Sequence, residues 1–122
     1  MKRIIFIGLI LIGLSSCGKD KELLDEIYND PGYAIGKITS SSTVVMVLTY
    51  HYDYQAGNTT HKGKKEGGIT NSPDSRMIGR RFLVVYKQSD PKQSDLNFRY
   101  PINTDQDFLD LLEQFKSNPP KR

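Results

Sequence analysis

Two histidines and one aspartate are the side chains in this sequence whose types and spacing suit metal chemistry. His51 and Asp53 lie close together in a run of alternating residues, and His61 follows further along the chain. The Gly57-Asn58 pair between them is a turn signal, so a hairpin would bring His51 and His61 onto paired strands. Two imidazoles and a carboxylate are ligands that zinc accepts. One interpretation is that the protein is a small metal-dependent enzyme that uses these three residues. The alternative is that they are half-exposed polar side chains on the solvent side of a strand.

Three tyrosines alternate with these polar residues. Tyr50, Tyr52 and Tyr54 have the period-two spacing that places them on one face of a strand. A flat ring with a hydroxyl suits a sugar ring or a protein partner, so these three are candidate ligand-binding residues. The favoured alternative is an ordinary core face whose hydroxyls reach the edge of the core.

The remaining polar patterns give no catalytic residue and no cofactor. Residues 40–42 are serines without the GxSxG elbow of a nucleophile, and residues 63–68 lack the spacing of a phosphate-binding loop. A basic group is a candidate surface for anionic lipid head groups, with a solvated loop as the alternative. Its members are Lys62, Lys64, Lys65, Arg76, Arg80 and Arg81.

Cys17 is the single cysteine of the 122 residues, and it lies where an apolar segment ends. The chain begins with Met1-Lys2-Arg3, and residues 4–14 follow without a polar side chain. As a helix that run is roughly 16 Å long, against a hydrocarbon core of about 30 Å, so it is too short to span a bilayer. A positive start, a short apolar run and small residues after it are typical of a secretory signal.

The stretch Leu14-Ser15-Ser16-Cys17 resembles the lipobox of bacterial lipoproteins. The resemblance implies cleavage between Ser16 and Cys17, a diacylglycerol thioether on Cys17 and acylation of the new amino group, for example with palmitate. Two or three acyl chains hold a protein on a membrane almost permanently. Gly18 stands where inner-membrane lipoproteins keep an aspartate, which implies the outer membrane, at its periplasmic face or at the cell surface. Small envelope lipoproteins of the Bacteroidetes type, of unknown function, are the proteins that the chain resembles.

Processing also changes the charge of the protein. The segment 1–16 carries Lys2, Arg3 and no acid, so its removal lowers the formal charge of +3 to near zero. A neutral chain is a poor candidate for nucleic-acid binding.

The periodicity of the rest predicts an α+β domain: a small antiparallel sheet or half-barrel with a C-terminal helix packed on it, preceded by the signal peptide and a short helical tether. The expected boundaries are 1–16 for the signal peptide, 17–32 for the lipidated N-terminus and tether, 33–118 for the domain and 119–122 for a loose tail. Strands are expected at 33–39, 43–54, 59–62, 80–87 and 96–102, with a turn at 40–42 and a long loop at 63–79. Thr104 is the expected N-cap of the final helix, which ends near Ser117.

A further likeness covers about 45 residues. The strand that follows Gly79 and ends in Tyr86, with Asp90-Pro91 and Ser94 after it, resembles a segment of small bacterial envelope proteins of unassigned function. It implies a shared small β fold and no known activity. The expected function is therefore that of a membrane-anchored lipoprotein which displays a non-enzymatic binding or structural domain, with a protein or glycan as its ligand.

Overall fold

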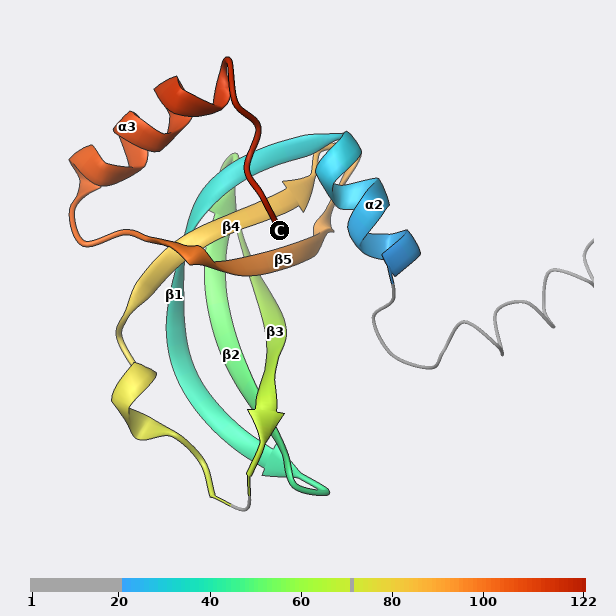
Figure 1. Cartoon of the computed structure of the whole chain (residues 1–122), viewed down its shortest axis with the longest axis vertical. Coiled ribbons are helices and arrows are strands. Elements are labelled where there is room, and N and C mark those ends of the chain that lie inside the picture. The colour runs from blue at the N-terminus through green and yellow to red at the C-terminus, as the bar shows by residue number, and fades with distance from the viewer. Residues whose placement is uncertain (1–20, 71) are drawn as a thin grey trace, which may run out of the picture.

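The computed structural model describes residues 21–70 and 72–122, so the signal segment, the cleavage position and Cys17 lie outside the described residues. Five strands, two α-helices and one short 3-10 helix make up this part of the chain (Figure 1). In chain order they are α2 (Lys21–Asn29), β1 (Pro31–Val44), β2 (Val47–Ala56), β3 (Thr59–Ile69), η1 (Ser75–Met77), β4 (Arg81–Lys87), β5 (Asp90–Pro101) and α3 (Asp105–Phe115). Neither of the described α-helices is of the length and apolarity needed to cross a membrane.

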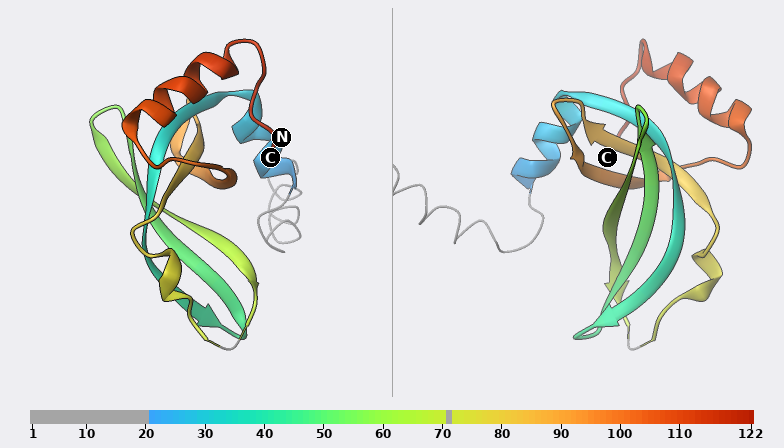
Figure 2. Two further views of the ribbon diagram at one scale, coloured as in Figure 1. Left: turned by 60° about the vertical axis from the view of Figure 1, so that its left-hand side comes forward. Right: turned by 180° about the vertical axis from the view of Figure 1, so that it is seen from behind.

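The strands form one antiparallel sheet in the order β3-β2-β1-β4-β5, which confirms the predicted α+β class. Strand β1 is long enough to serve both halves of the sheet, because residues 31–37 pair with β4 and residues 37–44 pair with β2. The sheet curls around this shared strand into a half-barrel (Figures 1 and 2). Strands β1 to β4 have the spatial order 4-1-2-3 of a Greek key, and β5 extends the sheet beyond β4. Connectivity of this kind hosts many functions and assigns none.

The two edge strands, β3 and β5, meet where the half-barrel curls back on itself. Each strand is antiparallel to its neighbour along the order of the sheet, so β3 and β5 run in the same direction. Side chains join them rather than a ladder of main-chain hydrogen bonds. We call this line the seam, and it is defined by the pair Lys65 of β3 and Asp95 of β5.

The inside of the half-barrel is an aromatic core. Its buried members are Ala34, Ile38, Leu48, Tyr50, Tyr52, Tyr54, Phe82, Val84 and Leu96. Glycines of β3 make room for the rings, because a Cβ on Gly63 would lie 2.3 Å from Cζ of Tyr52 and one on Gly67 would lie 2.3 Å from Cε2 of Tyr50. The rings therefore cover the bare backbone of β3, a pairing that compensates for glycine in a strand.

A second core lies between the opposite face of the sheet and the helices. Its buried residues are Ile27, Leu83, Val85, Ile102 and Phe115. Strand β4 supplies both cores because its residues alternate between the two faces and are apolar on each, as its sequence predicts. Helix α3 begins with a capping box in which Thr104 and Asp107 satisfy each other's main-chain N–H groups, which confirms the predicted N-cap.

Several local predictions are wrong. Residues 40–42 form no turn, since β1 continues to Val44. The single strand expected at 43–54 is interrupted, because the chain reverses at Val45-Met46 and β2 begins at Val47. The serines fit a strand because Ser41 Oγ donates to the carbonyl of Asp74 and Ser42 Oγ lies 3.0 Å from His51 Nε2. The expected loop 63–79 is instead strand β3 as far as Ile69, followed by a shorter connection that contains η1.

The tail is also docked rather than loose. The main-chain oxygen of Lys121 accepts a hydrogen bond from Asn97, and that of Arg122 accepts one from Arg99. The guanidinium of Arg122 pairs with Asp25 of α2. The tail is tied to β5 and α2 through main-chain oxygens and one ion pair, contacts that the polar sequence of the tail does not reveal.

Candidate functional site

The structure does not bring His51, Asp53 and His61 together. His61 is paired with Tyr54 and stacks on its ring at 5.4 Å between centroids, so it lies on the inner face of the β2–β3 hairpin. His51 and Asp53 point to the outer face, where Asp53 pairs with Lys62. Across residues 21–70 and 72–122 there is no group of three or more metal-ligating side chains.

The three tyrosines lie in the inner core and present no exposed platform to a ligand. Tyr50, Tyr52 and Tyr54 are 6 %, 1 % and 2 % exposed. Each hydroxyl has a partner within the protein: Tyr50 donates to Asp74, Tyr52 bonds Ser94 and Tyr54 donates to the carbonyl of Pro91. Burial raises the pKa of all three phenols. The three tyrosines therefore form a core face with hydroxyls at its edge, which is the interpretation that the sequence favoured over a ligand-binding platform.

The basic group is largely neutralised within the protein. Lys62, Lys65, Arg76 and Arg81 each pair with a carboxylate, at 3.2, 2.7, 3.1 and 3.3 Å. Among the described residues, the two members of the group without a carboxylate partner are Lys64 and Arg80. Lys64 lies on β3 and Arg80 lies in the segment before β4, so the two do not make a single anionic-lipid surface.

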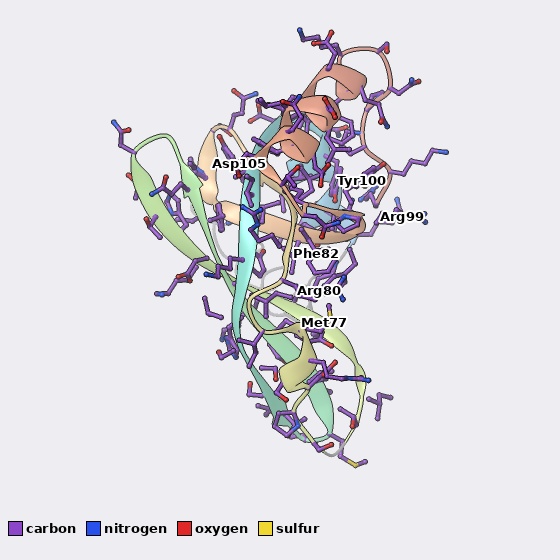
Figure 3. The ribbon with its side chains drawn as sticks, turned by 90° about the vertical axis from the view of Figure 1, so that its left-hand side faces the viewer. Met77, Arg80, Phe82, Arg99, Tyr100 and Asp105 are labelled. Atoms are coloured by element: carbon purple, nitrogen blue, oxygen red, sulfur yellow. The ribbon has the colours of Figure 1, made fainter. Side chains whose placement is uncertain are left out.

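Arg80 lies at the mouth of an aromatic-lined cleft. Its guanidinium carbon is 5.2 Å from the centroid of the Phe82 ring, and its Nη1 approaches the sulfur of Met77 at 3.5 Å. Figure 3 shows Arg80 between Met77 and Phe82 along the segment that leads into β4. The side chain is held over the ring by cation–π attraction and the thioether, which leaves its outer N–H groups for a ligand.

The cleft itself has aromatic walls and a volume of about 450 Å³. We call it the Arg80 cleft, and it is lined by Tyr50, Glu66, Gly67, Met77, Arg80, Phe82 and Phe98. Phe98 meets Phe82 edge to face at 4.9 Å and Tyr50 at 5.6 Å, so the three rings support one another. The cleft is shallow and open to solvent, and its lining combines these rings with the charged side chains of Arg80 and Glu66.

The main chain around Arg80 is held in place from two sides. The carbonyl of Arg80 accepts from the N–H of Ile38 at 3.0 Å, and its own N–H donates to the carbonyl of Met77 at 3.1 Å. Gly79 precedes it with φ of 89°, a left-handed conformation that suits glycine, and its N–H donates to Ile38 at 2.7 Å. Asp74 caps η1 at the start of this segment. The guanidinium therefore projects from a backbone fixed to β1.

The seam contains the buried charge of the described structure. Asp95 is 4 % exposed and accepts hydrogen bonds from Lys65 Nζ and from the hydroxyl of Tyr28, each at 2.7 Å. Asn97 donates to the same hydroxyl at 3.0 Å. Burial and the nearby Asp95 raise the pKa of Tyr28 far above its usual range. Every buried polar side-chain atom in the described part of the chain has a partner, and this cluster joins β3, β5 and α2 across the seam.

Sequence reasoning found Arg80 only as one of several basic residues, and it missed Phe98, Met77 and the seam. In comparisons with known proteins, no family model, no curated protein and no solved structure matches the chain.

Proposed function

We propose that this chain is a lipid-anchored protein of the bacterial cell envelope that displays a small, non-enzymatic binding domain. The observation that carries the proposal is the stretch Leu14-Ser15-Ser16-Cys17 after a positive start and an apolar run. Gly18 favours the outer membrane. The described domain agrees with such an arrangement because α2 begins at Lys21, soon after Cys17, and packs on the sheet through the buried Ile27.

The Arg80 cleft is our proposed binding site. A guanidinium in a fixed position binds carboxylate, phosphate or sulfonate groups through paired N–H donors. Met77 and Phe98, which are partly buried, offer apolar surface beside it, whereas Phe82 and Tyr50 are only 4 % and 6 % exposed. The ligand we propose is therefore an anion that carries a ring or another compact apolar body.

The anchor is tested by metabolic labelling with an alkyne fatty acid. The native chain should be labelled at Cys17, and Cys17→Ser should remain unprocessed and unlabelled. The double variant Cys17→Ser/Ser117→Cys restores one thiol at an exposed position outside the lipobox and should also stay unlabelled. A native chain whose mass shows an unmodified Cys17 would contradict the anchor.

The cleft is tested with 2-naphthalenesulfonate as the probe, by titration calorimetry on residues 18–122, which contain every residue of both cores. Arg80→Ala should weaken binding at least tenfold, since it removes a charge-assisted pair of about 2 kcal/mol. The affinity of Arg80→Lys should lie between those of the native protein and Arg80→Ala, because lysine keeps the charge without the planar guanidinium. Lys64→Ala removes the other unpaired cation of the basic group and should change nothing. Equal binding of neutral 2-methylnaphthalene would contradict the role of Arg80.

A further inference from the structure

Four apolar side chains are exposed at one end of the half-barrel, where β1 turns into β2 and β3 ends. Val44, Val45, Met46 and Ile69 are 63 %, 88 %, 55 % and 83 % exposed. They form one patch, since Ile69 is paired with Val47 and the N–H of Thr70 donates to the carbonyl of Met46 at 2.7 Å. We call this patch the apolar tip, and it lies at the lower end of the molecule in Figure 1.

The turn at the apolar tip has an unfavourable sequence for its conformation. Val45 and Met46 have φ values of 52° and 66°, both left-handed. A two-residue hairpin turn of this kind normally carries Asn-Gly, because a side chain branched at Cβ clashes in the left-handed region. A strained and exposed Val45 stabilises neither the turn nor a core. Strain that folding does not need is a sign of a functional contact.

The position of the tip relative to the anchor indicates what it contacts. Four Cα–Cα steps separate Cys17 from Lys21, so the start of α2 lies within about 14 Å of a lipid-bearing Cys17. Leu24 of α2 and Lys64 of β3 line one surface hollow, and β3 runs from there to Ile69. The beginning of α2, the edge of β3 and the tip therefore lie on one side of the molecule, as both views in Figure 2 show. Lys64 adds an unpaired cation on this side, which suits anionic head groups.

We propose that the apolar tip inserts into the hydrocarbon edge of the bilayer that holds the acyl chains of Cys17. This inference rests on the proposed lipid anchor. The acyl chains and the tip would be two separate points of attachment, and together they would fix the orientation of the domain on the membrane. Lys64 of β3 would then face the head groups.

The chain contains no tryptophan, so a single introduced one reports its own surroundings. The lipidated protein carrying Val45→Trp is reconstituted into vesicles of phosphatidylethanolamine and phosphatidylglycerol with or without brominated acyl chains. Its emission should shift to shorter wavelength and be quenched by the brominated lipid. The matched control Asn58→Trp, in the exposed β2–β3 turn, should emit as in water and escape quenching.

A second reporter guards against a misfolded Val45→Trp protein. Ile69→Trp should be quenched in the native background and released from quenching when Val45→Asn/Met46→Gly is added. That double change should also raise the melting temperature, because it relaxes the turn.

The other possible results separate a failure of the tip insertion from a failure of the lipid anchor. Unquenched tryptophan at 45 and 69 on a protein whose Cys17 carries lipid overturns the tip insertion and leaves the anchor intact. Absence of lipid on Cys17, measured by mass spectrometry, overturns the anchor itself. A shift that occurs without vesicles and grows with protein concentration shows that a second copy of the chain covers the tip, which also overturns the proposal.

Discussion

Lys65 Nζ lies 2.7 Å from a carboxylate oxygen of Asp95, and this ion pair joins the two strands that form the edges of the sheet. Asp95 is buried on β5, and Lys65 reaches it from β3 across a line without main-chain pairing. Tyr28 of α2 donates to the same carboxylate, so the pair also ties the first helix to the barrel. Four experiments probe this arrangement and the two cores.

Lys65→Met should lower the free energy of unfolding by about 3 kcal/mol, because it leaves a buried carboxylate without its cation. Urea denaturation measures the change. Adding Asp95→Asn should recover most of the loss, since a neutral amide oxygen still accepts from Tyr28. Lys62→Met breaks an exposed pair with Asp53 and should cost less than about 1 kcal/mol. Equal losses for Lys65→Met and Lys62→Met would show that the seam does not depend on its ion pair.

Alkaline pH should destabilise the protein. Burial raises the pKa of Tyr28 and Tyr52 above the ordinary tyrosine value of about 10, so the folded state keeps phenol protons that the unfolded chain loses. Stability is complete below pH 10 and falls as pH rises further, by up to about 1.4 kcal/mol per pH unit for each such tyrosine. The midpoint of urea unfolding, measured between pH 8 and pH 12, reports the loss of stability, and the absorbance of phenolate reports the ionisation of the tyrosines. Ionisation of all seven tyrosines near pH 10 without unfolding would contradict it.

Gly63→Ala should destabilise the hairpin by about 1–3 kcal/mol, the usual cost of overpacking. The new methyl group would lie 2.3 Å from the Tyr52 ring, which is 1 % exposed and bonded to Ser94. The side chain of the neighbouring Lys64 is exposed, so Lys64→Ala serves as the control. Thermal melts compare the two, and coincident melting curves would mean that Tyr52 moves aside at no cost.

Phe115→Ala should detach α3 and lower stability by about 3 kcal/mol. Phe115 is the buried residue of α3, and its ring meets Tyr33 at 5.1 Å and Tyr100 at 5.3 Å. Amide exchange along α3 should accelerate more than exchange in β4. Leu109→Ala removes an exposed side chain from the same helix and should leave both rates unchanged. Uniform acceleration across the sheet would show that α3 and the barrel unfold together.

Patterns within one element predicted that element well. Strand β4 reads as apolar on both faces and supplies both cores, and Thr104 is followed by acids in the order that a capped helix needs. These signals involve only neighbouring residues, so no knowledge of the fold is required to interpret them.

Features that depend on pairing between distant residues escaped the sequence. Gly63 and Gly67 indicate a loop by composition, yet they lie in a strand because tyrosine rings cover them. The Arg80 cleft combines Phe98 with Tyr50, whose contact depends on the curl of the sheet. Asp95 lies in a polar stretch that nothing marks as buried. Register and curvature decide these positions, and neither is written in a local pattern.

The seam also has a mechanical consequence. Because side chains rather than a main-chain ladder close the barrel, a change in its width would break the Lys65–Asp95 pair and none of the hydrogen-bond ladders of the four strand pairs. Glu66 and Gly67, next to Lys65 on β3, form one wall of the Arg80 cleft, and Phe98 of β5 forms part of the other. The Lys65–Asp95 ion pair therefore holds the two walls of the Arg80 cleft at a fixed separation.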